Sequence, residues 1–148
     1  MSEKVLEKLG SAEWHKATLL LMTTTAISMG LNAGVAAICV RVENGKEVWD
    51  IRALPVSGKF HREGLLAGSH GANYYGDVMG MMVVMLRTMT PSGTEADETL
   101  KLGESRNLGG LCVRYEGYEV FVAFSGGNSD INVELAEAGL SFLLAEYI

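Results

Sequence analysis

Proline, cysteine and aromatic residues are scarce in this sequence of 148 residues, which has two prolines, two cysteines and 7% aromatic side chains. Two cysteines cannot build the disulfide framework of a small secreted domain. Cys39 and Cys112 stand between apolar neighbours, so we expect two reduced thiols that pack as small hydrophobic groups. The segment Met1–Lys8 mixes charges and lacks the apolar core of a secretory signal. We therefore expect a cytoplasmic protein.

Long apolar runs and clusters of basic residues are also absent. Leu19–Met22 and Val78–Leu86 are far shorter than the roughly 20 residues that cross a bilayer. The chain has 18 acidic and 12 basic residues, a net charge of −6, and its basic residues are scattered. This composition argues against nucleic acid and membrane surfaces as partners. The length is typical of one domain, which we expect to span residues 1–148.

Two segments have the composition of helices whose apolar residues point in all directions. Ser11–Gly30 is rich in Leu, Met and Ala, and it ends on a glycine suited to the left-handed position after a helix. Gly71–Met89 carries five methionines among valines and leucines, and Pro91 follows it. Because a helix that is apolar all round must be covered on more than one side, we expect both to be covered in that way.

Two β-hairpins are predicted. Val35–Val42 and Lys46–Leu54 flank an Asn-Gly pair, which favours the positive φ angles of a tight hairpin turn. Leu111–Tyr115 and Tyr118–Phe124 flank a Glu-Gly turn and are rich in β-branched and aromatic residues. The order helix-hairpin-helix-hairpin-helix predicts an α+β fold, with an antiparallel sheet of four to five strands and helices packed on it.

The remaining segments are two connections and the last helix. We expect Val56–Ser69 to be a loop and Ser92–Gly110 to be an exposed connection with little regular structure. Ser129 or Asp130 is the expected N-cap of the last helix. The apolar stripe predicted for that helix consists of Ile131, Leu135, Ala138 and Phe142.

The strongest candidate site is the turn Ser125-Gly126-Gly127-Asn128, between a strand and the last helix. Two glycines let a ligand approach the backbone, and the N–H groups at a helix N-terminus favour an anion. Alternatively, the glycines only permit a sharp reversal of the chain. Ser125 lacks both a Gly-x-Ser-x-Gly context and a downstream histidine, which argues against serine-hydrolase chemistry.

The three histidines do not have the spacing of a zinc site. We expect His15 to be a surface or capping residue. His61 and His70 flank a glycine-rich loop, so both are candidate ligand-binding residues and candidate axial ligands of a haem-like cofactor. An enzyme with its active site between subunits is a weaker hypothesis, with His61, Arg62 and Asp77 as polar participants.

The C-terminal third of the chain resembles a known family. Val122–Gly127, a spacer of four residues, and Asn132–Leu140 are similar to the C-terminal signature of the GlcG/HbpS-like family, which includes the C-terminal domain of PduO-type proteins. Gly109–Val113 is also similar. Asn132 stands where the family usually has an aspartate, and Asp130 is a possible substitute for that acid.

This resemblance implies a profilin-like fold, assembly into homo-oligomers and, in some members, binding of haem or a corrinoid. Ser125, Gly126 and Gly127 are the positions that can be carried over. We therefore expect a small-ligand-binding protein that acts as a homo-oligomer. The alternative is a non-catalytic dimerisation or scaffolding module of profilin- or roadblock-like fold, whose interface uses Leu19–Ile27 or Met79–Met89.

Overall fold

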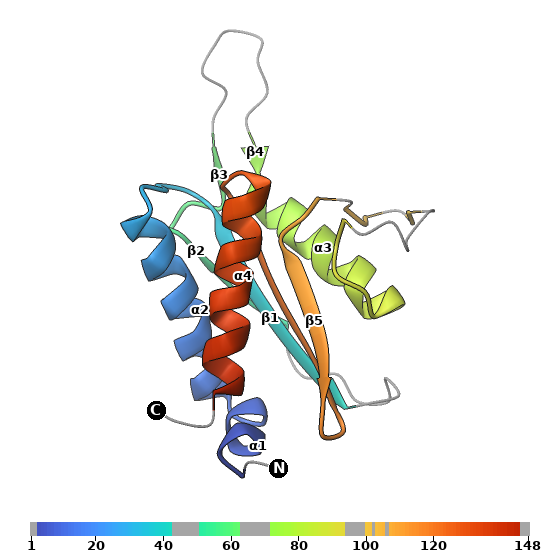
Figure 1. Cartoon of the computed structure of the whole chain (residues 1–148). Helices are drawn as coiled ribbons and strands as arrows, with labels where there is room; N and C mark the ends of the chain where they lie inside the picture. Colours follow the sequence, from blue (N-terminus) through green and yellow to red (C-terminus); the bar gives the residue numbers. More distant parts are fainter. Residues whose placement is uncertain are drawn as a thin grey trace, which may run out of the picture.

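The computed structural model describes residues 3–42, 51–62, 72–93, 100–101, 103–105 and 107–145 (Figure 1). In chain order its elements are α1 (Glu3–Leu9), α2 (Ala12–Ser28), β1 (Val35–Val42), β2 (Arg52–Pro55), β3 (His61–Arg62), β4 (Ala72–Asn73), α3 (Tyr74–Thr88), β5 (Gly110–Tyr115), β6 (Tyr118–Ser125) and α4 (Ser129–Leu144). The predicted α+β class and the predicted order of helices and hairpins are confirmed.

The main sheet of the described chain is antiparallel, with the strand order β2-β1-β6-β5. Both predicted hairpins form: β1 pairs with β2, and β5 pairs with β6. The central pair is β1 and β6, which run side by side from Val35 opposite Ser125 to Val42 opposite Tyr118. Pro55 closes β2 at the edge of the sheet, where its missing N–H is tolerated. The Asn-Gly turn predicted between β1 and β2 lies outside the described residues.

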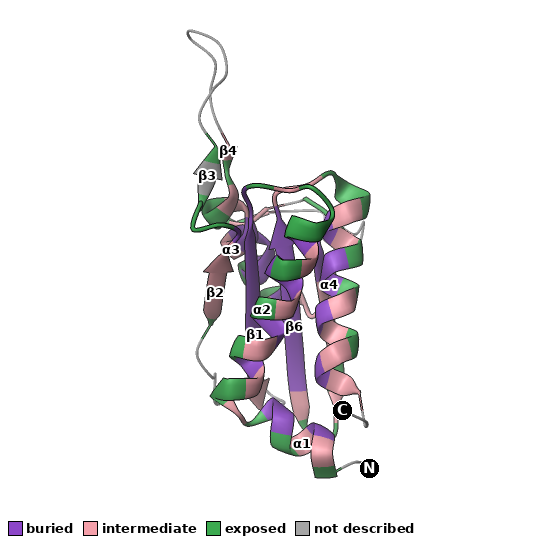
Figure 2. Cartoon of the chain, turned by 90° about the vertical axis from the view of Figure 1, so that its left-hand side faces the viewer, coloured by how far each residue is buried: buried purple, intermediate pink, exposed green. Residues whose placement is uncertain are grey.

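Helices cover both faces of this sheet. Alternate side chains of β1 and β6 point to opposite faces. Ile38 and Val122 join the core beneath α2 and α4, whereas Cys39 and Phe121 join the core beneath α3. The two central strands are buried along nearly their whole length (Figure 2). This three-layer arrangement places the C-terminal end of β6 between the first turns of α3 and α4.

Helix α1 was not predicted from the sequence, and it docks through two buried polar residues. Lys8 Nζ donates to the carbonyl oxygens of Phe142 at 2.7 Å and Ala145 at 3.0 Å, where the last carbonyls of α4 need donors. His15 is buried, and its Nε2 lies 2.7 Å from Leu9 O. Of the two alternatives for His15, the surface position is wrong, and its ring instead lies against the last carbonyl of α1, a helix that the sequence did not predict.

The buried face of α4 differs from the predicted stripe. The buried residues are Asn132, Leu135, Ala136, Gly139 and Leu143, so only Leu135 of the predicted stripe is fully buried. The reason is a close helix contact, because a Cβ on Gly139 would lie 2.5 Å from Met22 Sδ of α2. The side of α4 that carries Gly139 therefore faces α2, where a larger side chain would not fit. Its N-cap is Asn128, and neither Ser129 nor Asp130 takes that position.

Two connections are more ordered than the sequence suggested. His61 and Arg62, within the predicted loop Val56–Ser69, pair as β3 with Asn73 and Ala72 of β4, which the sequence assigned to the start of the helix Gly71–Met89. Ser92, at the start of the predicted exposed connection, is buried. Its N–H donates to Gly110 O at 3.1 Å and its Oγ accepts from Gly110 N–H at 2.8 Å. A buried polar residue is retained here because both of its polar groups have partners.

Candidate functional site

The turn that the sequence singled out joins the end of β6 to the N-cap of α4. Gly126 has a φ of 146°, and a Cβ on it would lie 2.6 Å from Gly34 Cα. A Cβ on Gly34 would in turn lie 2.8 Å from Ser125 O. The lack of side chains at Gly126 and Gly34 thus lets two backbone segments pack against each other. This packing role explains Gly126 without any ligand.

Part of the hydrogen-bonding capacity of this turn is used within the protein. The Gly127 N–H donates to Asn132 Oδ1 at 2.9 Å, and the Ile131 N–H donates to Asn128 Oδ1 at 2.9 Å. These two amides are therefore not left for a ligand. Ser129 and Asp130 occupy the first turn of α4, whose N–H groups have no acceptor within the helix.

Asp77 of α3 joins three segments beside the turn. Its Oδ2 accepts from Ser125 Oγ at 2.6 Å, and its Oδ1 accepts from Ser105 Oγ at 2.8 Å and from Asn107 Nδ2 at 2.6 Å. Ser125 is buried, so this hydrogen bond satisfies the hydroxyl of a side chain with little access to water. The sequence pointed to Asp77 only under the weaker hypothesis of an enzyme. Ser105 and Asn107 were missed because no local pattern marks them within a polar segment.

A cavity of about 550 Å³ opens between the first turns of α3 and α4, at the end of the sheet where both helices begin (Figure 1). Most of the side chains around it carry an amide, a hydroxyl or a carboxylate. The lining residues are Ala72, Asn73, Tyr74, Asp77, Asn107, Leu108, Ser125, Gly126, Gly127, Asn128, Ser129 and Asn132. All four residues of the predicted turn therefore border one hollow.

Asn132 lies on the inner side of this cavity and is only 6% exposed. Asp130, which the sequence offered as the substitute for a family aspartate at this place, is exposed and does not line the cavity. That substitution is therefore not supported, because Asp130 lies on the outer side of the first turn of α4.

The predicted histidines have a weaker connection to the cavity. The backbone of His61 pairs with Asn73, a lining residue, but the side chain of His61 is outside the described structure. His70 also lies outside the described residues. Arg62 is exposed and is not part of the lining. The structure therefore brings Asp77 to the cavity and leaves Arg62 away from it.

A second, apolar hollow of about 460 Å³ adjoins the first and shares Asn73 with it. Phe60 and Tyr75 line it, and their rings pack edge to face with centroids 5.5 Å apart. Both rings remain partly exposed, at 42% and 45%. A polar cavity and an aromatic surface thus meet at the start of α3.

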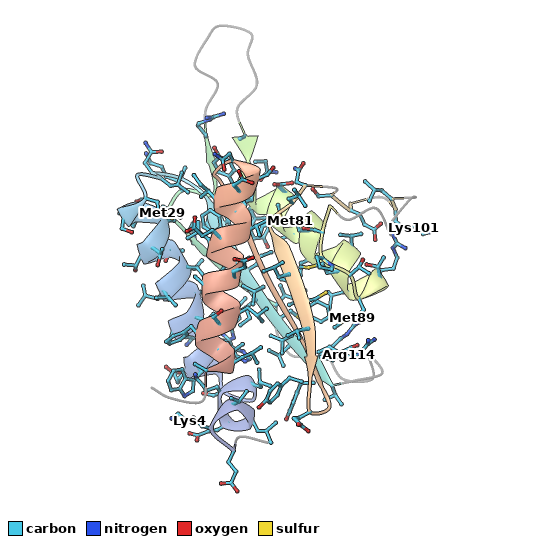
Figure 3. All side chains as sticks on the ribbon, in the orientation of Figure 1. Lys4, Met29, Met81, Met89, Lys101 and Arg114 are labelled. Atoms are coloured by element: carbon cyan, nitrogen blue, oxygen red, sulfur yellow. The ribbon has the colours of Figure 1, made fainter. Side chains whose placement is uncertain are left out.

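The described residues contain no group of three or more His, Cys, Asp and Glu side chains that could hold a metal ion. Cys39 and Cys112 are not joined in a disulfide, and β6 separates them, since both stand opposite Phe121. Burial raises the pKa of each thiol to about 11. Cys39 belongs to the core beneath α3 and Cys112 packs against that core. Met81, labelled on α3 in Figure 3, belongs to the same core. Within the described structure, no helix is both long and apolar enough to cross a membrane.

Comparisons with known proteins identify the fold. Neither a family model nor a curated protein matches the chain. The crystal structure of Klebsiella pneumoniae protein ORFY, described with the family model DUF336, superposes with a TM-score of 0.54 at 15% identity, covering 93% of this chain and 90% of that one. The crystal structure of the Ybr137w protein superposes with a TM-score of 0.53 at 12% identity, covering 99% of this chain and 95% of that one. At these identities the likeness shows a shared fold.

Proposed function

We propose that this protein binds a small polar molecule in the cavity between the first turns of α3 and α4. The observation that carries the proposal is the cavity itself, of about 550 Å³, at which Ser125–Ser129, Asp77 and Asn107 converge. Its volume lies within the roughly 300–1,000 Å³ of small-molecule sites, and such sites use a few convergent polar groups to orient the ligand. Ser125, Gly126, Gly127 and Asn128 are the proposed ligand-binding residues.

The wall of this cavity is held in place before any ligand arrives. The three hydrogen bonds to Asp77 connect α3, the end of β6 and the segment before β5. Hydrogen bonds to a carboxylate are among the stronger ones in proteins. Rigid polar walls lower the ordering cost of binding, which supports a binding site rather than an incidental gap.

The described lining does not fit a haem or a corrinoid. Such macrocycles need apolar surfaces against both faces and an axial ligand, most often a histidine, cysteine or methionine. The described lining contains none of these three residue types and consists mainly of amides, hydroxyls and a carboxylate. We therefore assign no role to these cofactors. His61 remains a proposed ligand-binding residue at the neighbouring strand, and the prediction for His70 stays untested.

A GlcG-like identity has separate support. Residues 122–140 resemble the GlcG/HbpS-like signature, and DUF336, the family model in the description of ORFY, is the GlcG-like family. The two observations are independent, because one concerns a short motif and the other the fold of nearly the whole chain. They favour a small-ligand-binding protein of this type.

A cavity-filling variant tests the binding proposal. Ala72 lines the cavity, so Ala72→Phe is expected to abolish the binding of small polar metabolites observed by ligand-detected NMR. Ala12→Phe makes the same change at an exposed position of α2 and is expected to leave binding intact. If Ala72→Phe does not fold, as judged by circular dichroism, Leu108→Trp fills the same cavity from another segment. Binding that survives both folded variants would contradict the proposal.

Self-association is the second candidate function, and it is supported by the outer face of α2. Leu20 is 59% exposed and Ile27 is 51% exposed. They are two helical turns apart and therefore lie on one side. We expect a homo-oligomer that Leu20→Lys dissociates, as measured by light scattering after size exclusion. Val83→Lys, on the exposed side of α3, tests the other predicted interface, Met79–Met89. A wild-type chain that stays monomeric at high concentration would exclude both interfaces.

A further inference from the structure

The side-chain amide of Asn132 points to the chemistry of the ligand. Asn132 is on α4, lines the cavity and is buried. Its Oδ1 accepts the Gly127 N–H at 2.9 Å, and this bond fixes which end of the amide is the oxygen. Among the residues that the structure describes, the Nδ2 group of Asn132 has no acceptor. A buried NH2 group without a partner is unfavourable, and a bound acceptor would satisfy it.

The first turn of α4 adds one further donor at the same place, the Ser129 N–H, since Ser129 lines the cavity and Asp130 does not. Asn128 caps the Ile131 N–H with its side chain, and the first bond within the helix runs from Asn132 N–H to Asn128 O. The N–H groups of Ser129 and Asp130 precede that bond, so the helix offers them no acceptor. Because α4 is 16 residues long, its dipole also favours negative charge at this end.

The opposite wall is different, because the Asp77 carboxylate accepts hydrogen bonds from its side chains. Ser125 Oγ donates its hydrogen to Asp77, and Asn107 Nδ2 also donates to Asp77. Ser125 and Asn107 retain acceptor positions, the Ser125 Oγ lone pairs and Asn107 Oδ1, together with the second hydrogen of Asn107 Nδ2. A ligand that spans the cavity therefore meets donors at the α4 side and mainly acceptors at the Asp77 side.

We propose that the ligand is a small carboxylate that carries a hydroxyl or ammonium group. Its carboxylate accepts from Asn132 Nδ2 and from the Ser129 N–H of α4, and its donor faces Ser125 and Asn107. A phosphate ester fits less well, because no lysine or arginine is among the described lining residues and Asp77 contributes a negative charge. This inference rests on the proposed function of the cavity, whose ligand class it defines.

Matched pairs of probes test it. L-Lactate and L-alanine are compared with lactamide and alaninamide, in which a neutral amide replaces the carboxylate, by ligand-detected NMR and calorimetry. The carboxylates are expected to bind at least about tenfold more tightly than their amides. Inorganic phosphate is titrated alongside and is expected to bind more weakly than either carboxylate.

Asn132→Asp is the decisive variant. An aspartate keeps an oxygen for the Gly127 N–H and replaces the NH2 group by a negatively charged oxygen. We expect it to weaken carboxylate binding at least about tenfold and to leave amide binding unchanged. Asn32→Asp makes the same change in charge at an exposed position outside the lining and is expected to change neither.

The outcomes separate the two proposals. If the amides bind as well as the carboxylates, or if phosphate binds best, the carboxylate inference is wrong while the binding function stands. Equal carboxylate affinity in Asn132→Asp and wild type also overturns the inference. If none of these probes binds and a broader panel of polar metabolites also fails, both proposals are wrong.

Discussion

Helices α2 and α3 have similar apolar composition, yet the fold buries them differently. The buried residues of α2 form one stripe that includes Leu19, Met22 and Ala26, whereas Leu20 and Ile27 on its outer side stay exposed. The buried residues of α3 spread over more than half of its circumference. The prediction that both helices are covered on more than one side thus holds for α3 and fails for α2 within this chain.

The difference arises from one stretch of chain beyond the end of α3. A Cβ on Gly80 would lie 2.9 Å from Ser105 Cβ and 3.0 Å from Gly103 O, so this stretch lies directly on the second side of α3. Leu100 packs against the same core. The same stretch supplies Ser105 and Asn107 to Asp77. One stretch of chain therefore both covers α3 and forms part of the cavity wall.

The largest expected effect concerns the core beneath α3. Met82 is fully buried there, so Met82→Ala removes packed atoms and leaves a cavity. We expect the free energy of unfolding to fall by about 2–5 kcal/mol. Leu20→Ala on the exposed side of α2 should change it by less than about 0.5 kcal/mol. Urea denaturation at low protein concentration measures both, and similar losses in the two variants would show that the outer side of α2 is covered.

The sequence alone predicts the elements of this fold well, and for a local reason. Each hairpin has its turn residues between two strands, and each long helix has a composition typical of helices. The signals for these elements therefore lie in residues that are close together in the sequence. The pairing of β1 with β6 depends on contacts between distant parts of the chain and was not predicted. Neither was α1, whose docking depends on Lys8 reaching the far end of α4.

The candidate site could be predicted only in part, for the same physical reason. The turn Ser125–Asn128 is continuous in sequence and was recognised, and it does border the cavity. The opposite wall consists of Asp77, Ser105 and Asn107, which tertiary folding brings together from separate segments. Gly126 shows the converse. In the sequence it suggested close approach of a ligand to the backbone, but in the structure it packs against Gly34.

A smaller effect tests whether the stretch at Gly103–Ser105 really lies on α3. In an uncovered helix, Gly→Ala is stabilising by about 1 kcal/mol. At Gly80 the added methyl group meets backbone atoms of that stretch, and such overpacking costs about 1–3 kcal/mol. We therefore expect Gly80→Ala to lower the free energy of unfolding by about 1 kcal/mol. Thr24→Ala, on the exposed side of α2, should follow helix propensity and slightly raise the free energy of unfolding. If Gly80→Ala also raised it, α3 would be open on this side.

The smallest expected effect is a pH dependence of the free energy of unfolding that arises on the α3 side alone. Arg87 of α3 donates from Nε to Glu104 Oε2 at 2.6 Å and from Nη2 to Oε1 at 2.8 Å. These hydrogen bonds lower the pKa of Glu104 from the usual 4.5 to about 2. Because the folded protein holds the ionised form more strongly than the unfolded chain does, this contribution is complete above pH 4.5 and is lost as the pH falls from 4.5 to 2.

The matching variant is Glu104→Gln, which keeps the shape of the side chain and removes its charge. Unfolding by urea, followed at several pH values, should show a stability difference between wild type and Glu104→Gln that is largest above pH 4.5 and shrinks towards pH 2. Glu13→Gln on α2 removes an exposed partner of Lys16, 3.8 Å away, and surface pairs of this kind contribute little. A stability difference between wild type and Glu104→Gln that stays constant over this pH range would mean that Arg87 does not hold the covering stretch on α3. An effect of equal size for Glu13→Gln would remove the contrast between the two helices.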